Sequence, residues 1–143
     1  MNNPDMQSLS ALRPLPHPTP DTQPFWDGLR EGQLLLQHCS ECGAVRHYPR
    51  PMCDQCYSME HSWQPASGRG AVYSWTETHH AFNPAFKAEL PYVLVTADLE
   101  EGVRVNAQLR DAAISDLAIG RAITLSFEQV SDELVVPVVR LED

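Results

Sequence analysis

Positive charge is scarce in this sequence. One lysine and nine arginines face 19 acidic residues, which gives a net charge of −9. A protein that binds a nucleic-acid backbone needs a basic stripe to displace the counterions of the phosphates. The charge balance therefore argues against a nucleic-acid partner.

Long hydrophobic runs are also missing. No stretch approaches the roughly 20 apolar residues that cross a membrane, and the first residues have neither the basic nor the apolar segment of a secretory signal. We expect a cytoplasmic protein without a membrane partner. Because the cytoplasm keeps thiols reduced, the four cysteines are interpreted as metal ligands before disulfides.

The 143 residues, 43% of them apolar, suffice for a modest core in one domain or two small ones. Six of the twelve prolines fall within the first 24 residues. Proline fixes φ and removes a backbone donor, so residues 1–20 are predicted to form an extended arm. This arm is either disordered or laid along a partner.

A short helix is predicted after the arm. Asp21 or Thr22 can cap it, Pro24 suits its first turn, and Gly32 can end it. Three apolar side chains would share one side of this helix: Phe25, Trp26 and Leu29. That side either packs on the core of the protein or forms a docking face for another subunit.

The rest of the chain is predicted to be mainly β. Two strands at residues 33–38 and 44–48 form a first block. Alternating and β-branched segments then predict five more strands, at residues 70–81, 92–99, 103–109, 122–130 and 135–141, with one helical turn within 114–119. Five strands with a short helical insertion fit a five-stranded OB-fold barrel; an open five-stranded sandwich is the alternative.

Four cysteines form two C-x-x-C turns separated by ten residues: Cys39, Cys42, Cys53 and Cys56. Two such turns supply the four thiolates of a tetrahedral Zn²⁺ site. Four cysteines leave no open position for water, so the zinc would be structural. Gly43 fits a position of positive φ after the second ligand, and His47 is expected at the surface or beside the ligands. An iron centre is the rival interpretation.

The order of several motifs resembles the zinc-ribbon and OB-fold family once catalogued as domain of unknown function 35. The resemblance covers about residues 22–140 and rests on Phe25-Trp26-Asp27-Gly28-Leu29, Cys39-x-x-Cys42-Gly43, Tyr48-Pro49-Arg50, Cys53-x-x-Cys56, Ser67-Gly68-Arg69-Gly70 and Val72-Tyr73-Ser74-Trp75-Thr76. It implies an N-terminal helix and a rubredoxin-like zinc ribbon within residues 21–66, followed by an OB-fold barrel at residues 67–143.

The resemblance also implies a role. Such proteins are non-catalytic accessory subunits of acyl-CoA enzymes, either thiolase-superfamily enzymes (thiolases or aldolases) or hydratases, and they are thought to bind the acyl-CoA or to complete its channel. We accordingly assign no catalytic residue. The residues predicted to contact the partner or the acyl-CoA are aromatic or cationic: Phe25, Trp26, Phe82, Phe86, Arg46, Arg50 and Lys87.

Two other function classes stay open. Zinc ribbons and OB barrels also bind single-stranded nucleic acid, although residues 69–143 hold six basic and twelve acidic groups. The chain could also be a small enzyme or an iron electron carrier. Glu77 and His79, which would share a face of one strand, are the one acid–base pair of the barrel, but no nucleophile accompanies them.

Overall fold

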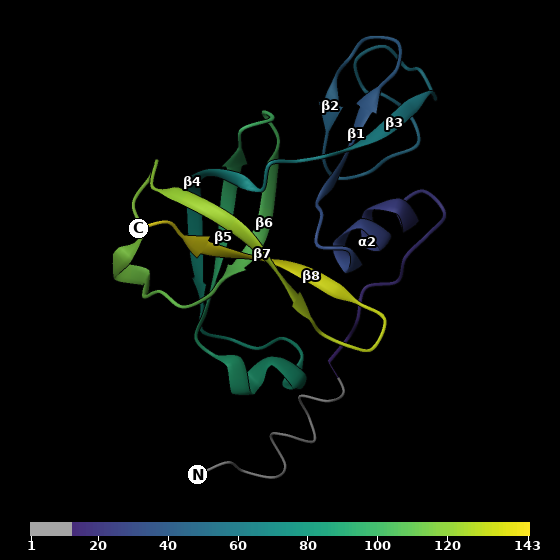
Figure 1. Cartoon of the computed structure of the whole chain (residues 1–143). Coiled ribbons are helices and arrows are strands. Elements are labelled where there is room, and N and C mark those ends of the chain that lie inside the picture. The colour runs from purple at the N-terminus through teal and green to yellow at the C-terminus, as the bar shows by residue number, and fades with distance from the viewer. Residues whose placement is uncertain (1–12) are drawn as a thin grey trace.

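The computed structural model describes residues 13–143, which fold into a small three-stranded sheet, one α-helix and a closed five-stranded barrel. Figure 1 shows the three-stranded sheet and helix α2 together on one side of the barrel. The predicted mainly β class, with an N-terminal helix and a five-stranded barrel, is confirmed. No helix in the described part of the chain is long and apolar enough to cross a membrane.

The arm leads directly into helix α2 (Gln23–Arg30), which has the expected proline in its first turn. The predicted side-chain cap is wrong: Thr22 is the N-cap residue, but its hydroxyl accepts a hydrogen bond from the Thr19 amide at 2.9 Å instead of capping the helix. Residues 13–19 form neither helix nor strand, and the first twelve residues of the predicted arm lie outside the described residues.

The small sheet contains β1 (Leu35–Cys39), β2 (Val45–Arg46) and β3 (His61–Pro65), in the order β2-β1-β3. The first two were expected, although β2 is shorter than residues 44–48. Strand β3 was missed because its sequence, HSWQP, has little apolar alternation and most of its side chains face solvent. It is held by backbone pairing with β1 along its whole length.

The barrel consists of the five expected strands: β4 (Arg69–Thr78), β5 (Tyr92–Leu99), β6 (Arg104–Leu109), β7 (Ala122–Gln129) and β8 (Val135–Leu141). Alternate residues point inward, such as Val95 and Ala97 of β5 and Val105 and Ala107 of β6, all buried. Strand β4 ends three residues earlier than predicted.

The barrel wall is weakest where β6 meets β8. Their parallel pairing is confined to Gln108 with Val138 and Leu109 with Val139. Pro137, which has no N–H to donate, lies just beyond this pairing. Helix α2 packs against β8, so an element outside the barrel covers one of the two strands of this short pairing.

Two short 3₁₀ helices join barrel strands. Helix η2 (Ile114–Asp116) lies within the predicted helical turn. Helix η1 (Pro84–Glu89) lies between β4 and β5; the side chain of Asn83 accepts a hydrogen bond from the Ala85 amide at 2.9 Å and starts the helix. Helix η1 lies at the end of the molecule opposite the small sheet (Figure 1).

Candidate metal centre and adjoining cavity

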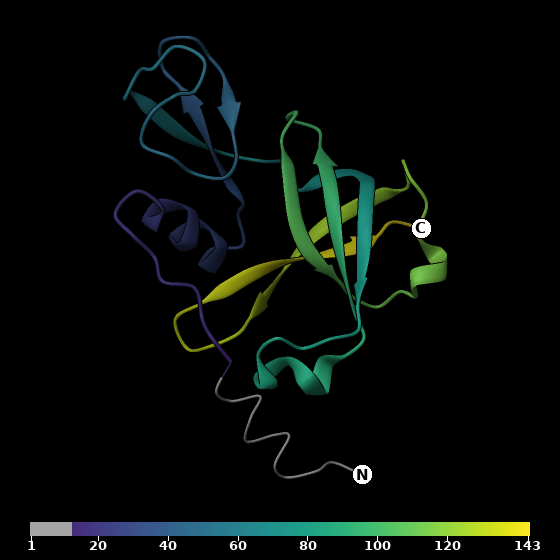
Figure 2. The same cartoon turned by 180° about the vertical axis from the view of Figure 1, so that it is seen from behind.

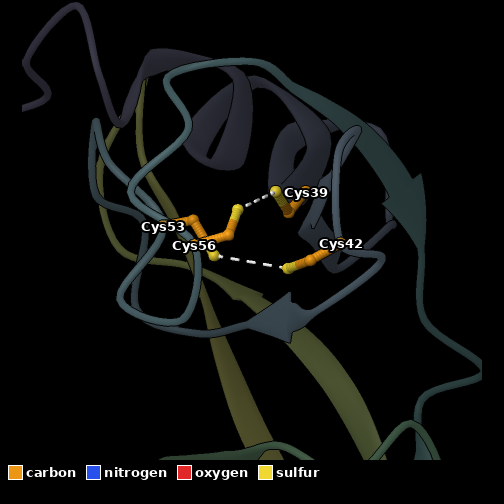
Figure 3. A group of neighbouring side chains, drawn as sticks. All are labelled: Cys39, Cys42, Cys53 and Cys56. Atoms are coloured by element: carbon orange, nitrogen blue, oxygen red, sulfur yellow. Dashed lines mark hydrogen bonds between the residues drawn. The ribbon is translucent and has the colours of Figure 1, made fainter.

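The four cysteines meet at one end of the small sheet, with their side chains directed toward one another (Figure 3). All four sulfurs lie within 4.8 Å of one another. The sulfurs of Cys39 and Cys56 are 3.5 Å apart, and those of Cys42 and Cys53 are 3.7 Å apart. Tetrahedral zinc with bonds of about 2.3 Å separates its sulfurs by about 3.8 Å, so the donor set fits this ion.

The two cysteine turns repeat the same backbone geometry. The Gly43 amide donates to the Cys39 carbonyl at 3.0 Å, and the Tyr57 amide donates to the Cys53 carbonyl at the same distance. Both Gly43 and Tyr57 have positive φ, of 79° and 64°. The first was predicted from the glycine, whereas a tyrosine gives no sequence signal for this conformation.

Backbone amides stabilise the thiolate form of the first cysteine in each turn. Hydrogen bonds from the backbone, above all at Cys42, lower the pKa of Cys39 to about 6, and those at Cys56 and Gln55 lower the pKa of Cys53. Although the Ser58 amide favours the Cys56 thiolate, hydrogen bonding with Cys39 and burial raise the pKa of Cys56 to about 12. The turns thus stabilise part of the negative charge, and a bound cation would stabilise the rest.

A buried polar network supports the loop between the two turns. The side-chain oxygen of Gln37 accepts hydrogen bonds from Arg46 Nε at 2.7 Å and from the Arg50 amide at 2.9 Å. Arg46 Nη2 donates to the Arg50 carbonyl at 3.0 Å. Because Arg46 is only 5% exposed, its guanidinium is committed to ordering this loop.

An apolar cavity of about 290 Å³ lies where helix α2 and this loop cover the short pairing of β6 with β8. Its volume is close to the lower end of the range of roughly 300–1,000 Å³ found for small-molecule sites. Side chains from all three parts line it, among them Phe25, Trp26, His47, Leu94, Val136 and Pro137.

One end of the cavity is polar. Arg110 of the barrel donates two hydrogen bonds to Glu128, from Nε and Nη2, each at 2.9 Å. This pairing raises the pKa of Arg110 and lowers that of Glu128. Arg13 of the arm lines the same cavity.

His47 is half-buried against aromatic side chains, whereas the sequence-based expectation was a place at the surface or beside the metal ligands. Its ring packs at a tilt against Phe25, with ring centroids 5.3 Å apart, and against Tyr48, with centroids 4.0 Å apart. Within the described residues neither ring nitrogen has a hydrogen-bond partner, and burial lowers the pKa of His47 to about 4. The imidazole is therefore neutral at neutral pH.

We predict that His47 makes the protein less stable as the pH falls from about 6.5 to about 4. In this range the unfolded chain binds a proton at position 47 and the folded chain does not, so the free energy of unfolding decreases, by about 3 kcal/mol in total. Urea denaturation at a series of pH values measures the loss. The variant His47→Phe should show a shallower decline, because only cysteine and carboxylate protonation would remain; parallel curves would contradict the neutral buried imidazole.

The other predicted contact residues do not gather at one place. Phe82 is 94% exposed, and its ring meets His80 edge-on at 4.7 Å. Phe86 and Lys87 lie on η1, at the end of the molecule opposite the small sheet. Arg50 is exposed and pairs with Asp54 at 3.7 Å. Of the seven predicted residues, only Phe25 and Trp26 line the apolar cavity.

Glu77 and His79 form the expected acid–base pair, although β4 ends at Thr78 and His79 lies one residue beyond the strand. His79 Nε2 lies 2.7 Å from Glu77 Oε1, and the His79 side chain is largely exposed. The pair lines none of the larger hollows of the described residues.

These features define a class of protein: a rubredoxin-like zinc ribbon joined to an OB-fold barrel. Family comparisons assign residues 26–61 to the rubredoxin-like zinc ribbon domain of ChsH2 and residues 63–128 to its C-terminal OB-fold domain. The chain belongs to the DUF35 family, as the resemblance of its motifs implied. The four cysteines form the structural zinc site of the ribbon.

Three similar proteins illustrate this family. The chain is 35% identical over 134 residues to a probable enoyl-CoA hydratase alpha subunit of Thermomonospora curvata, which covers 94% of this chain and 41% of that protein. It is 30% identical over 110 residues to a DUF35 domain-containing scaffold protein of Methanocaldococcus jannaschii, covering 76% and 77%. A solved structure of an Ltp2-ChsH2(DUF35) aldolase matches with a TM-score of 0.81 and 33% identity, covering 89% of this chain and 98% of that chain. The chain thus spans about two fifths of the hydratase subunit.

Proposed function

We propose that the chain is a non-catalytic accessory subunit that assembles with a thiolase-superfamily enzyme, either a thiolase or an aldolase, or with a hydratase, and helps to hold its acyl-CoA. The observation that carries this proposal is the match of nearly the whole chain to part of a probable enoyl-CoA hydratase alpha subunit and to a chain of an Ltp2-ChsH2(DUF35) aldolase. Those proteins share the zinc ribbon and barrel but not one reaction, which suggests that this part serves different catalysts.

The cavity supports a role in holding the acyl group. It is lined mainly by apolar side chains, and it lies between the ribbon and the barrel, so both parts of the fold shape it. Phe25 and Trp26 would contact the acyl chain there. Phe82, whose ring is almost completely exposed, is the aromatic residue best placed to contact a partner enzyme.

The phosphates of CoA would contact a different part of the chain from the acyl group. Arg46 is buried and bound to Gln37, whereas Arg50 is exposed beside an open cleft that Arg104 also lines. We propose Arg50 as the phosphate contact of this chain, with Lys87 at the other end of the molecule contacting the partner enzyme instead.

Co-expression tests the assembly. The chain, carrying a tag, is expressed with thiolase-superfamily enzymes and acyl-CoA hydratases from its own genome, and complexes are isolated by size-exclusion chromatography. We expect one of these enzymes to co-purify and to turn over an acyl-CoA faster than either protein alone. Turnover by the isolated chain, or salt-sensitive binding of single-stranded DNA without any enzyme partner, would contradict the proposal.

Filling the cavity should weaken the acyl-CoA site of that complex. Leu94 lines the cavity and is partly exposed, so Leu94→Trp can occupy the space without disturbing the barrel interior. We expect KM for a medium-chain acyl-CoA to rise about tenfold or more, with unchanged assembly. The control His79→Ala removes the acid–base pair and should leave turnover within about twofold; a loss of several orders of magnitude in an intact complex would make this chain catalytic.

A further inference from the structure

The described part of the arm crosses the same side of the molecule as the cavity. It runs from helix α2 past the β7–β8 hairpin toward η1 (Figure 2). Leu15, Pro16 and Pro18 line a second hollow, of about 420 Å³, together with Trp26 and with Leu134 of that hairpin. Trp26 also lines the apolar cavity, so the arm and the cavity share one aromatic wall.

Arg13 anchors this arm at the polar end of the cavity. Its Nη1 lies 3.3 Å from Glu89 Oε1, and its guanidinium lies over the ring of Phe86, 5.0 Å from the ring centre. It lines the cavity beside Arg110 and Glu128. The arm is thus fastened to η1 across the end of the hollow.

The two arginines at this end are held very differently. Arg110 makes a bidentate pair with Glu128 between two barrel strands and is part of a rigid wall. Arg13 makes one ion pair, with Glu89, and one contact with the Phe86 ring; both partners of the ion pair are 26% exposed, and residues 13–19 have no regular secondary structure. Partly exposed ion pairs and cation–π contacts are individually weak, so the Arg13 contact can open while the barrel stays intact.

We propose that Arg13 is a latch: its contacts with Glu89 and Phe86 hold the arm over the polar end of the cavity, and opening of this latch admits the apolar group of a ligand. This inference rests on the proposed function only in that the natural ligand would be an acyl chain. It assigns to the arm control of entry into the cavity, which is separate from assembly with an enzyme.

The latch is tested on the zinc-loaded chain of 143 residues with N-phenyl-1-naphthylamine, a neutral apolar dye whose emission rises in apolar surroundings. Stopped-flow mixing gives its association rate. We expect Arg13→Gln to bind the dye at least about threefold faster than the wild type, because the ion pair and the ring contact are both lost. Arg140→Gln, which removes an arginine paired with Asp111 outside the cavity, is the matched control and should keep the wild-type rate.

The salt dependence of the dye association rate distinguishes a latch from a contact that is merely structural. Raising the ionic strength screens the Arg13–Glu89 pair, so the wild-type rate should rise with salt, whereas the rate of Arg13→Gln should not. Arg13→Lys, which keeps the charge, should regain the salt dependence. Equal rates in wild type and Arg13→Gln, a salt-independent wild type, or no dye binding to either protein would overturn the latch. Co-purification with an enzyme is unaffected by these results and decides the proposed function independently.

Discussion

Replacing Cys42 by serine is expected to abolish zinc binding and to unfold the ribbon. The ribbon has only twelve residues in strands, and three of its four cysteine ligands lie outside them, so the metal supplies much of its stability. Loss even of groups that merely orient zinc ligands costs 10–100-fold in affinity, and loss of a thiolate should exceed about 100-fold. Zinc per chain, measured by mass spectrometry of the metal, should fall from one ion to almost none.

The same variant tests whether the chain divides into independent parts. We propose that residues 67–143 form a separate folding unit, so backbone NMR signals of the barrel should persist while those of residues 33–66 collapse. Ser40→Ala, an exposed change between Cys39 and Cys42, is the control and should retain zinc. Full zinc content in Cys42→Ser would show that three thiolates suffice, and a red protein with bound iron would contradict the zinc assignment.

Local patterns predicted the metal site well because its ligands are fixed by local geometry. Each C-x-x-C turn brings two sulfurs together through backbone hydrogen bonds within six residues, so spacing alone carried the signal. The barrel strands were also predictable, since inward residues such as Val95 and Ala97 alternate with outward ones. Strand β3 was not predicted because backbone pairing with β1, and not a side-chain pattern, determines it. The positive φ of Tyr57 was not predicted because it is set by the turn that carries the cysteine ligands.

The cavity could not be predicted from sequence because it depends on contacts between distant segments. His47 was expected at the surface or beside the metal ligands, yet it packs against Phe25 of α2, and burial lowers its pKa. Arg46 looked like a free cation, yet the amide of Gln37, nine residues earlier, binds it. In both cases a polar residue type suggested the surface, and tertiary packing overrode that preference.

Replacing Gly70 by alanine is expected to cost at least about 3 kcal/mol of the free energy of unfolding. A Cβ at this position would lie 2.1 Å from the Asp98 carbonyl oxygen, which is backbone and cannot rotate away. Gly70 pairs with Leu99 of β5 and with Ile123 of β7, so relieving the clash would move β4 away from both neighbours where the barrel closes. Overpacking a core costs about 1–3 kcal/mol. Because a shift of β4 would disturb its hydrogen bonds with both β5 and β7, we expect the cost to reach or exceed the upper end of this range.

Gly68→Ala provides the matched comparison for this clash. Gly68 lies two residues earlier, has a φ of +78° and has no atom within 4 Å of a built Cβ, so alanine there costs only the left-handed strain of about 1–2 kcal/mol. Chemical denaturation of both variants should therefore rank Gly70→Ala as clearly less stable, with loss of barrel signals in near-UV circular dichroism. If the two substitutions cost the same, conformational strain and not the close approach of β4 to β5 explains the glycine at position 70.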